Sequence, residues 1–161
     1  MKIRAECCDD GEEEIVIRYH SGSDTVRRVT TALERLLYSG REMVFRSSGA
    51  EYYLPLNSIL FFESSDGKVY AHTIDKIFTA DYKLFELERL LPSCFVRVSK
   101  SVILNVYKIS SLHRELVGNG YVTFKESDKC AYFSRGYHRL LKDKIEEMRL
   151  IYEDSHPNEN L

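Results

Sequence analysis

Residues 95–105, which read FVRVSKSVILN, constrain the fold of this chain more than any other stretch. Apolar residues on both sides of a short polar cluster predict two strands joined by a bend. The cluster is formed by Arg97, Ser99, Lys100 and Ser101. The serine hydroxyls can donate hydrogen bonds to a phosphate backbone, and the lysine ammonium supplies positive charge. The alternative interpretation is an ordinary solvated bend, since polar residues often stabilise turns.

The length and the cysteine usage indicate one domain of ordinary size in a reducing compartment. A chain of 161 residues can bury a sizeable core without disulfides. Cys7, Cys8, Cys94 and Cys130 form no CxxC pair and no metal-ligand spacing with the histidines, so we expect free thiols. The start, MKIRAECCDDGEEE, has no signal-peptide pattern, and no apolar run approaches the roughly 18 residues of a membrane span. We therefore expect a soluble, cytoplasmic protein with no transmembrane segment.

The net charge of −2 hides an uneven distribution of charge along the chain. Residues 1–95 carry 12 Lys/Arg and 16 Asp/Glu, residues 96–149 carry 11 and 6, and residues 150–161 carry three acids alone. The basic second half can present one cationic face to nucleic acid. Chance fluctuation of charge along the chain is the alternative.

Residues 1–40 form a separate part of the sequence. Residues 15–19 read as one strand, and Ser23 or Asp24 can cap a helix that runs to about Tyr38. Such a small α+β segment cannot form a core of its own, so it must pack on the following domain, on a regulatory protein partner or on a second copy. We expect residues 1–40 to serve dimerisation or partner contact, residues 41–152 to form the main domain, and residues 153–161 to be a disordered tail.

The main domain reads as a succession of short strands. Strand patterns occur at residues 43–46, 51–54, 59–63, 68–73, 77–79, 109–112, 121–125 and 130–133. A helix with Asp81 as its N-cap and Pro92 as its stop interrupts them, and an amphipathic helix over residues 136–152 follows them. These features predict a mainly β, antiparallel fold with a few short helices.

Four segments are recognisable together: PLNSILFFES, KVYAHT, FVRVSKSVILNVYKI and YFSRGYHRLLKDKI. In this order and spacing, over residues 43–146, the chain resembles the LytTR family of bacterial DNA-binding domains. The resemblance implies an elongated antiparallel β-sandwich that reads the major groove of double-stranded DNA with loops between strands, and it implies a transcriptional regulator. No cofactor is implied.

In such domains three loops carry the side chains that face DNA. Carried onto this sequence, the loops are Asp66, Gly67 and Lys68; Ser99, Lys100 and Ser101; and Ser134, Arg135 and Gly136. The guanidinium of Arg135 can bind guanine O6 and N7 with two hydrogen bonds, and Lys100 can reach the same acceptors as a point charge. The three serines are expected to bind phosphate oxygens, and so is Lys68.

The sequence departs from the family at two points. Family members often have His or Asn where this chain has Gly67 or Lys68 and Lys100, so their base preference does not carry over. Most members also place the domain behind a phosphate-accepting receiver domain, which forty residues cannot form. We therefore expect a stand-alone regulator that binds repeated half-sites as a homodimer, with its input from a partner protein, dimer assembly or its own abundance.

Two other function classes remain open. A hydrolase could use Ser99 or Ser134 with His72 or His138, although no GxSxG elbow or metal spacing supports this. A protein-interaction or RNA-binding module is favoured by the acidic N-terminal segment and the 11 tyrosines, which show no paired stacking motif. Other polar residues have structural interpretations: Arg97 can hold an acid such as Glu63, and Asn105 can satisfy a carbonyl.

Overall fold

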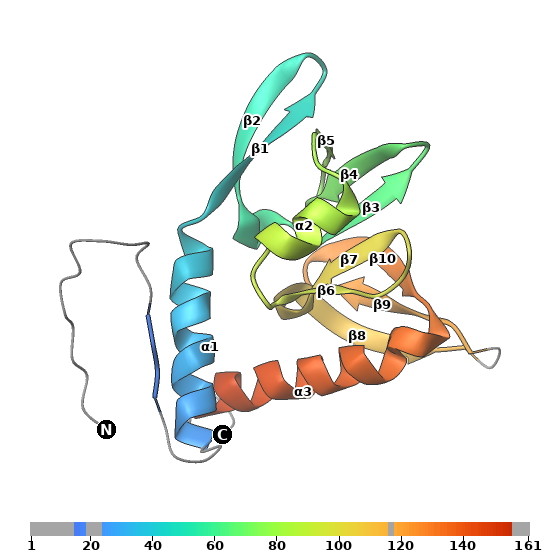
Figure 1. Ribbon diagram of the computed structural model, residues 1–161. Coiled ribbons are helices and arrows are strands. Elements are labelled where there is room, and N and C mark those ends of the chain that lie inside the picture. The colour runs from blue at the N-terminus through green and yellow to red at the C-terminus, as the bar shows by residue number, and fades with distance from the viewer. Residues whose placement is uncertain (1–14, 19–23, 116–117, 156–161) are drawn as a thin grey trace, which may run out of the picture.

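The computed structural model describes residues 15–18, 24–115 and 118–155, and two antiparallel sheets form its centre (Figure 1). The larger sheet has the strand order β2-β1-β5-β4-β3-β7-β6, and the smaller sheet has the order β10-β9-β8. The larger sheet comprises β1 (Glu42–Ser47), β2 (Ala50–Pro55), β3 (Phe61–Ser65), β4 (Lys68–His72), β5 (Ile77–Ala80), β6 (Phe95–Arg97) and β7 (Val102–Asn105). The smaller comprises β8 (Ile109–Arg114), β9 (Gly120–Phe124) and β10 (Ser127–Phe133). The prediction of a mainly antiparallel β fold is confirmed.

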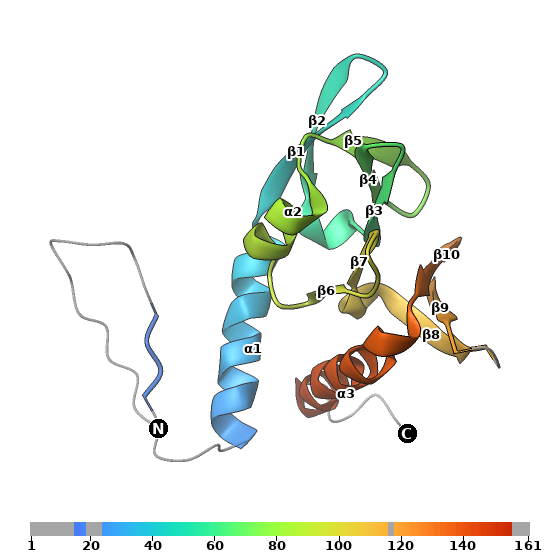
Figure 2. The same ribbon diagram turned by 45° about the vertical axis from the view of Figure 1, so that its right-hand side comes forward.

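Three α-helices and three short 3₁₀ turns accompany the sheets. They are α1 (Asp24–Ser39), η1 (Leu56–Ser58), α2 (Leu84–Leu90), η2 (Val106–Lys108), η3 (Arg135–Tyr137) and α3 (His138–Ser155). In both views α1 lies on the left, below β1, and α3 lies below the strands (Figures 1 and 2). No helix in the described ranges is long and apolar enough to cross a membrane.

The two sheets share one hydrophobic core because alternate residues of their strands point inward. Phe61 of β3 stacks on Phe124 of β9, with ring centroids 5.3 Å apart, and so joins one sheet to the other. Along β9, Val122 and Phe124 are buried while the residue between them is only partly covered. This two-residue period is the pattern from which the strand was predicted.

The side chain of Asn105, at the end of β7, fixes the last turn of α1 to this core. Its amide nitrogen donates to the Tyr38 hydroxyl at 2.7 Å and to the Ile59 carbonyl at 2.8 Å. Its amide oxygen accepts from the backbone N–H of Tyr107 at 3.2 Å, and the Tyr38 hydroxyl donates to the Leu56 carbonyl at 2.9 Å. Burial raises the pKa of Tyr38, so its hydroxyl stays protonated. The prediction that Asn105 satisfies a carbonyl is confirmed.

The structure corrects the predictions at the ends of two elements. Residues 15–18 form no strand, because no described strand pairs with them, and Tyr19 lies outside the described residues. Asp81 does not cap α2, since its carboxylate pairs with the guanidinium of Arg46 at 2.9 Å. The helix begins two residues later, where the backbone N–H of Lys83 donates to the Glu86 carboxylate at 2.7 Å.

The final helix and the tail also differ from the sequence prediction. The chain passes through the 3₁₀ turn η3 before α3 begins at His138, two residues after the predicted start. Leu141 and Met148 are buried as its amphipathic pattern predicts, whereas Leu140 is 54% exposed. The predicted tail over residues 153–161 is helical as far as Ser155, because α3 continues through this point, and residues 156–161 lie outside the described part.

A lysine clamp joins the β4–β5 turn to the smaller sheet. The ammonium of Lys129 donates to the carbonyls of Thr73 and Lys76, each at 2.8 Å, and the Ser127 hydroxyl donates to the Ile74 carbonyl at 3.1 Å. Burial lowers the pKa of the Lys129 ammonium from its ordinary value. The clamp places a positive charge close to His72, the last residue of β4.

His72 is buried in its neutral form. Its ring stacks on Phe61 with centroids 4.0 Å apart, and its Nε2 atom has no hydrogen-bond partner. Glu63 Oε2 lies 3.6 Å from Nε2, which is too far for a hydrogen bond. Burial, and then the charge of Lys129, lower the pKa of His72 to about 4. The imidazole is therefore uncharged at neutral pH, and the Glu63 contact is not an ion pair there.

His72 is expected to make the protein less stable as the pH falls from 6.5 towards 4. In this window the unfolded chain binds a proton on His72 and the folded chain does not, so acid favours unfolding. Lowering the pH from 7.5 to 5 should remove about 2 kcal/mol of unfolding free energy through this residue. Urea denaturation at the two pH values measures the loss. Over the same pH change, the His72→Gln variant should lose about 2 kcal/mol less unfolding free energy than the wild type. An equal loss in both proteins would show that His72 is not the cause.

Candidate nucleic-acid interface

The first predicted loop is the tight turn between β3 and β4. Asp66 and Gly67 have φ angles of 51° and 76°, and the Ser65–Lys68 pair closes the hairpin behind them. Two consecutive positive φ angles suit Asp-Gly, because glycine adopts them without strain. Gly67 and Lys68 are both exposed at the tip. The hairpin turn predicted from the sequence is therefore present.

The second predicted loop is the bend between β6 and β7. The backbone N–H of Val98 donates to the Val102 carbonyl at 3.0 Å and closes the bend. Within it, the backbone N–H of Ser101 donates to the Ser99 hydroxyl at 3.1 Å. Ser99 and Ser101 are partly covered, while Lys100 is exposed. Lys100 is therefore the residue of this bend most available to a partner.

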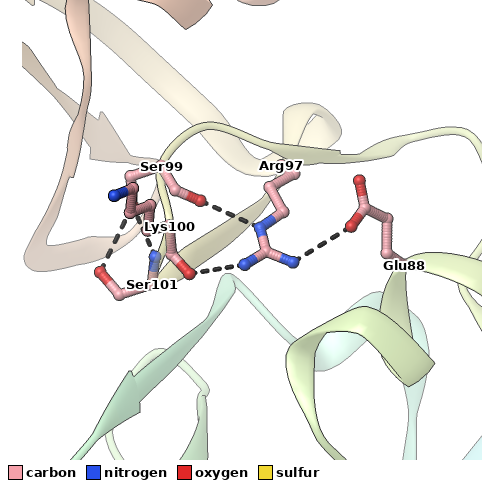
Figure 3. Close-up of polar contacts among 5 residues, drawn as sticks. All are labelled: Glu88, Arg97, Ser99, Lys100 and Ser101. Carbon is pink, nitrogen blue, oxygen red and sulfur yellow. Dashed lines mark hydrogen bonds and ion pairs between the residues drawn. The ribbon is translucent and has the colours of Figure 1, made fainter.

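The side chain of Arg97, at the end of β6, lies between this bend and Glu88 (Figure 3). Its guanidinium donates to the carbonyls of Ser99, at 3.0 Å, and Lys100, at 2.5 Å, and also pairs with the Glu88 carboxylate at 3.1 Å. The prediction that Arg97 holds Glu63 is wrong. The acid is Glu88 on α2, because this helix packs beside β6.

The third predicted loop follows β10. The backbone N–H of Ser134 donates to the Val98 carbonyl at 2.9 Å, and the backbone N–H of Arg135 donates to the side-chain oxygen of Asn119 at 3.3 Å. The stem of Arg135 lies over Gly118, where an added Cβ would be only 2.9 Å from Arg135 Cδ. Arg135 and Gly136 are exposed. The β8–β9 turn therefore supports the third loop.

The structure brings the three loops to one end of the two sheets. Ser134 contacts the second loop through Val98, and the backbone N–H of Ser64, just before the first loop, donates to the Ser101 carbonyl at 2.8 Å. The β3–β4 turn and the end of β10 both lie on the right-hand side of Figure 1. Lys68, Lys100 and Arg135 are exposed there, and the described part of the chain offers none of them an acidic side chain as an ion-pair partner. Three exposed basic side chains therefore lie at this end, beside the exposed Asp66 of the hairpin turn.

Sequence reasoning missed two supporting groups at this end. Asn119 holds the backbone of the third loop, although the sequence indicated only a turn at Gly118-Asn119-Gly120. Arg97 and Glu88 hold the second loop, and nothing in their spacing shows this. In the described ranges, no cluster of three His, Cys, Asp or Glu side chains could hold a metal ion.

The sequence of this domain also matches a known family. The family model described as the LytTr DNA-binding domain matches residues 50–146, more than half of the chain. The chain belongs to the LytTR family. This LytTR domain contains all three loops, since Asp66 and Gly136 both fall within the matched range. The family is one of DNA-binding domains and not of enzymes.

The relatives agree with this assignment. Uncharacterized HTH-type transcriptional regulators of Staphylococcus aureus strains NCTC 8325 and COL are 32% identical to this chain over 95 residues, and the one of strain MRSA252 is 30% identical. The matched region is 58% of this chain, and the chain spans 63% of the length of these relatives. Among solved structures, the LytTr DNA-binding domain of a putative methyl-accepting/DNA response regulator from Bacillus cereus superimposes with a TM-score of 0.60. That match is 21% identical and covers 65% of this chain and 95% of the other, and it confirms the fold.

Proposed function

We propose that this LytTR domain binds double-stranded DNA sequence-specifically, with its three loops in the major groove, and acts as a cytoplasmic bacterial transcriptional regulator. The observation that carries the proposal is the meeting of the loops at one end that carries three exposed basic side chains, through the hydrogen bonds of Ser134 to Val98 and Ser64 to Ser101. Exposed basic side chains on a rigid sheet end can bind phosphates and reach base edges together.

The exposed side chains suggest a division of roles. Arg135 reads a guanine, because its planar guanidinium can donate to O6 and N7 together. Lys68 binds a phosphate from the hairpin tip, and Lys100 reaches either a phosphate or a base as a point charge. The hydroxyls of Ser99, Ser101 and Ser134 set the register on the backbone, while Gly67 lets the hairpin approach the duplex closely.

The helix α1 is the proposed contact between two protomers or with a regulatory protein. Thr31 and Tyr38 are buried and mark the side of α1 that faces the domain. Helical spacing places Val29, Leu33 and Leu36 on the opposite side, and Leu36 is 69% exposed. An apolar stripe that faces away from the core suits a second copy of this helix. Residues 41–152 then form the DNA-binding unit of each protomer.

The proposal is tested by fluorescence anisotropy with duplexes from the promoter region of the protein's own gene, at two salt concentrations. We expect salt-sensitive binding about 10³-fold tighter than to a scrambled duplex. A duplex with two repeated half-sites should bind two protomers, as measured by analytical ultracentrifugation. Leu36→Glu should weaken two-site binding and leave one-site binding unchanged, whereas Thr30→Glu, on another side of α1, should change neither. Equal weak binding to every duplex would refute sequence-specific recognition.

A row of rings on the smaller sheet favours the RNA-binding alternative. His113 stacks on Tyr121 with centroids 4.6 Å apart, and Tyr132 lies 5.9 Å from Tyr121 and is 60% exposed. The three residues are aligned across β8, β9 and β10, so sequence spacing did not reveal them. Exposed rings can stack on unpaired bases. Tighter binding to single-stranded RNA than to any duplex in the same assay would select this alternative.

A further inference from the structure

The side chain of Arg97 binds two successive carbonyls of the bend over residues 99–101. Arg97 Nε donates to the Ser99 carbonyl and Nη2 to the Lys100 carbonyl, at 3.0 and 2.5 Å. The third nitrogen, Nη1, contacts Glu88 Oε2 at 3.1 Å (Figure 3). All three nitrogens of the guanidinium are thus used inside the protein, on two consecutive loop carbonyls and one carboxylate.

These contacts compensate for the absence of strand pairing in the bend. The pairing of β6 with β7 ends at Arg97 and Ile103, so residues 99–101 lie outside the ladder. The backbone N–H of Ser101 donates to the Ser99 hydroxyl, and the Ser101 carbonyl accepts from the Ser64 N–H of β3, while Arg97 binds the carbonyls of Ser99 and Lys100. A loop that becomes ordered only on binding loses conformational entropy at that moment, and a loop that is already ordered avoids that loss.

The same contacts keep the charge of Arg97 inside the protein. The Arg97 side chain is 21% exposed, and its partner Glu88 neutralises it locally. The side chain of Lys100, in contrast, is exposed, and its backbone carbonyl accepts a hydrogen bond from Arg97. A lysine at position 97 would keep the positive charge but lacks the planar fork that reaches three acceptors.

We propose that Arg97, held by Glu88, is a positioning residue that orders the bend over residues 99–101 for DNA binding without contacting DNA itself. This inference rests on the proposed function for its effect on DNA. The ordering of the bend is a property of the free protein. Helix α2 is then part of the DNA-binding apparatus, because it supplies the carboxylate that fixes the guanidinium.

The test compares the full-length wild type with Arg97→Lys in two measurements. In amide hydrogen exchange, the Ser101 N–H should exchange about tenfold faster in Arg97→Lys, while Ile103 in β7 keeps its rate. In duplex binding, Arg97→Lys should lose about tenfold in affinity with an unchanged salt slope. Lys100→Ala, in contrast, should reduce the salt slope by about 0.9 if Lys100 binds a phosphate.

Arg46→Lys is the matched control, because Arg46 also forms ion pairs, with Glu51 and Asp81, but lies on β1. This control should change neither the Ser101 exchange rate nor the affinity for the duplex. Glu88→Ala, like Arg97→Lys, should raise the Ser101 exchange rate and weaken binding. The inference is overturned if the Ser101 N–H exchanges at the same rate in Arg97→Lys as in the wild type. It is also overturned if Arg97→Lys reduces the salt slope of binding, because that reduction marks a direct contact between Arg97 and a phosphate. If the wild type binds no duplex, the proposed function fails, and the exchange rates alone decide whether Arg97 orders the bend.

Discussion

Replacing Asn105 with aspartate is expected to lower the free energy of unfolding by about 3–5 kcal/mol, a large part of the roughly 5–15 kcal/mol that stabilises an ordinary domain. The Asn105 side chain is fully buried, and its amide nitrogen donates to the Ile59 carbonyl at 2.8 Å. An aspartate oxygen in that place would face the carbonyl oxygen without a proton between them. The Tyr38 hydroxyl cannot compensate, because it already donates to the Leu56 carbonyl. Urea denaturation followed by far-UV circular dichroism measures the change, since the chain has no tryptophan.

Asn57→Asp is the matched control for this experiment. Asn57 lies in η1, close to the same network, and its side chain is exposed. The same chemical change should therefore alter the free energy of unfolding by no more than about 0.5 kcal/mol. If Asn105→Asp were no less stable than Asn57→Asp, the buried network would not hold α1 to the core.

Replacing Arg135 with alanine is expected to cost about 1–3 kcal/mol of binding at one base-pair position, which is about a 5- to 150-fold loss of preference there. The backbone N–H of Arg135 donates to the Asn119 side chain, and alanine keeps this bond, so the loop should keep its position in the variant. Anisotropy with a duplex series that varies one base pair at a time measures the preference. The variant should bind the previously disfavoured duplexes nearly as well as the preferred one.

Lys68→Ala and Arg135→Lys separate the roles in this interface. Lys68→Ala should weaken binding to every duplex alike and reduce the salt slope by about one unit, as expected of a phosphate contact. Arg135→Lys should keep the salt slope but lose the base preference, because an ammonium cannot form the paired hydrogen bonds. An equal loss for all sequences in Arg135→Ala would make Arg135 a phosphate contact as well.

The strands and turns of this protein could be predicted from the sequence, because their causes are local. The alternation of buried and exposed residues gives β9 its inward face, and Asp66-Gly67 provides the two positive φ angles of the β3–β4 turn. The order of the segments also pointed to the family and so to the three loops. The start of α2 was predicted two residues too early, since Asp81 is engaged by Arg46, which is distant in the sequence.

The sequence by itself therefore determined the elements, the family and which loops to consider. Only the tertiary structure decided what holds the second and third loops, namely Glu88 with Arg97 and Asn119 with Arg135, and what holds α1 to the core, namely Asn105 with Tyr38. It also aligned His113, Tyr121 and Tyr132 in one row across three strands. The physical reason is that periodicity and turn preference depend on neighbouring residues in the chain. A hydrogen bond between distant side chains depends instead on how helices and sheets pack, and no local pattern records that packing.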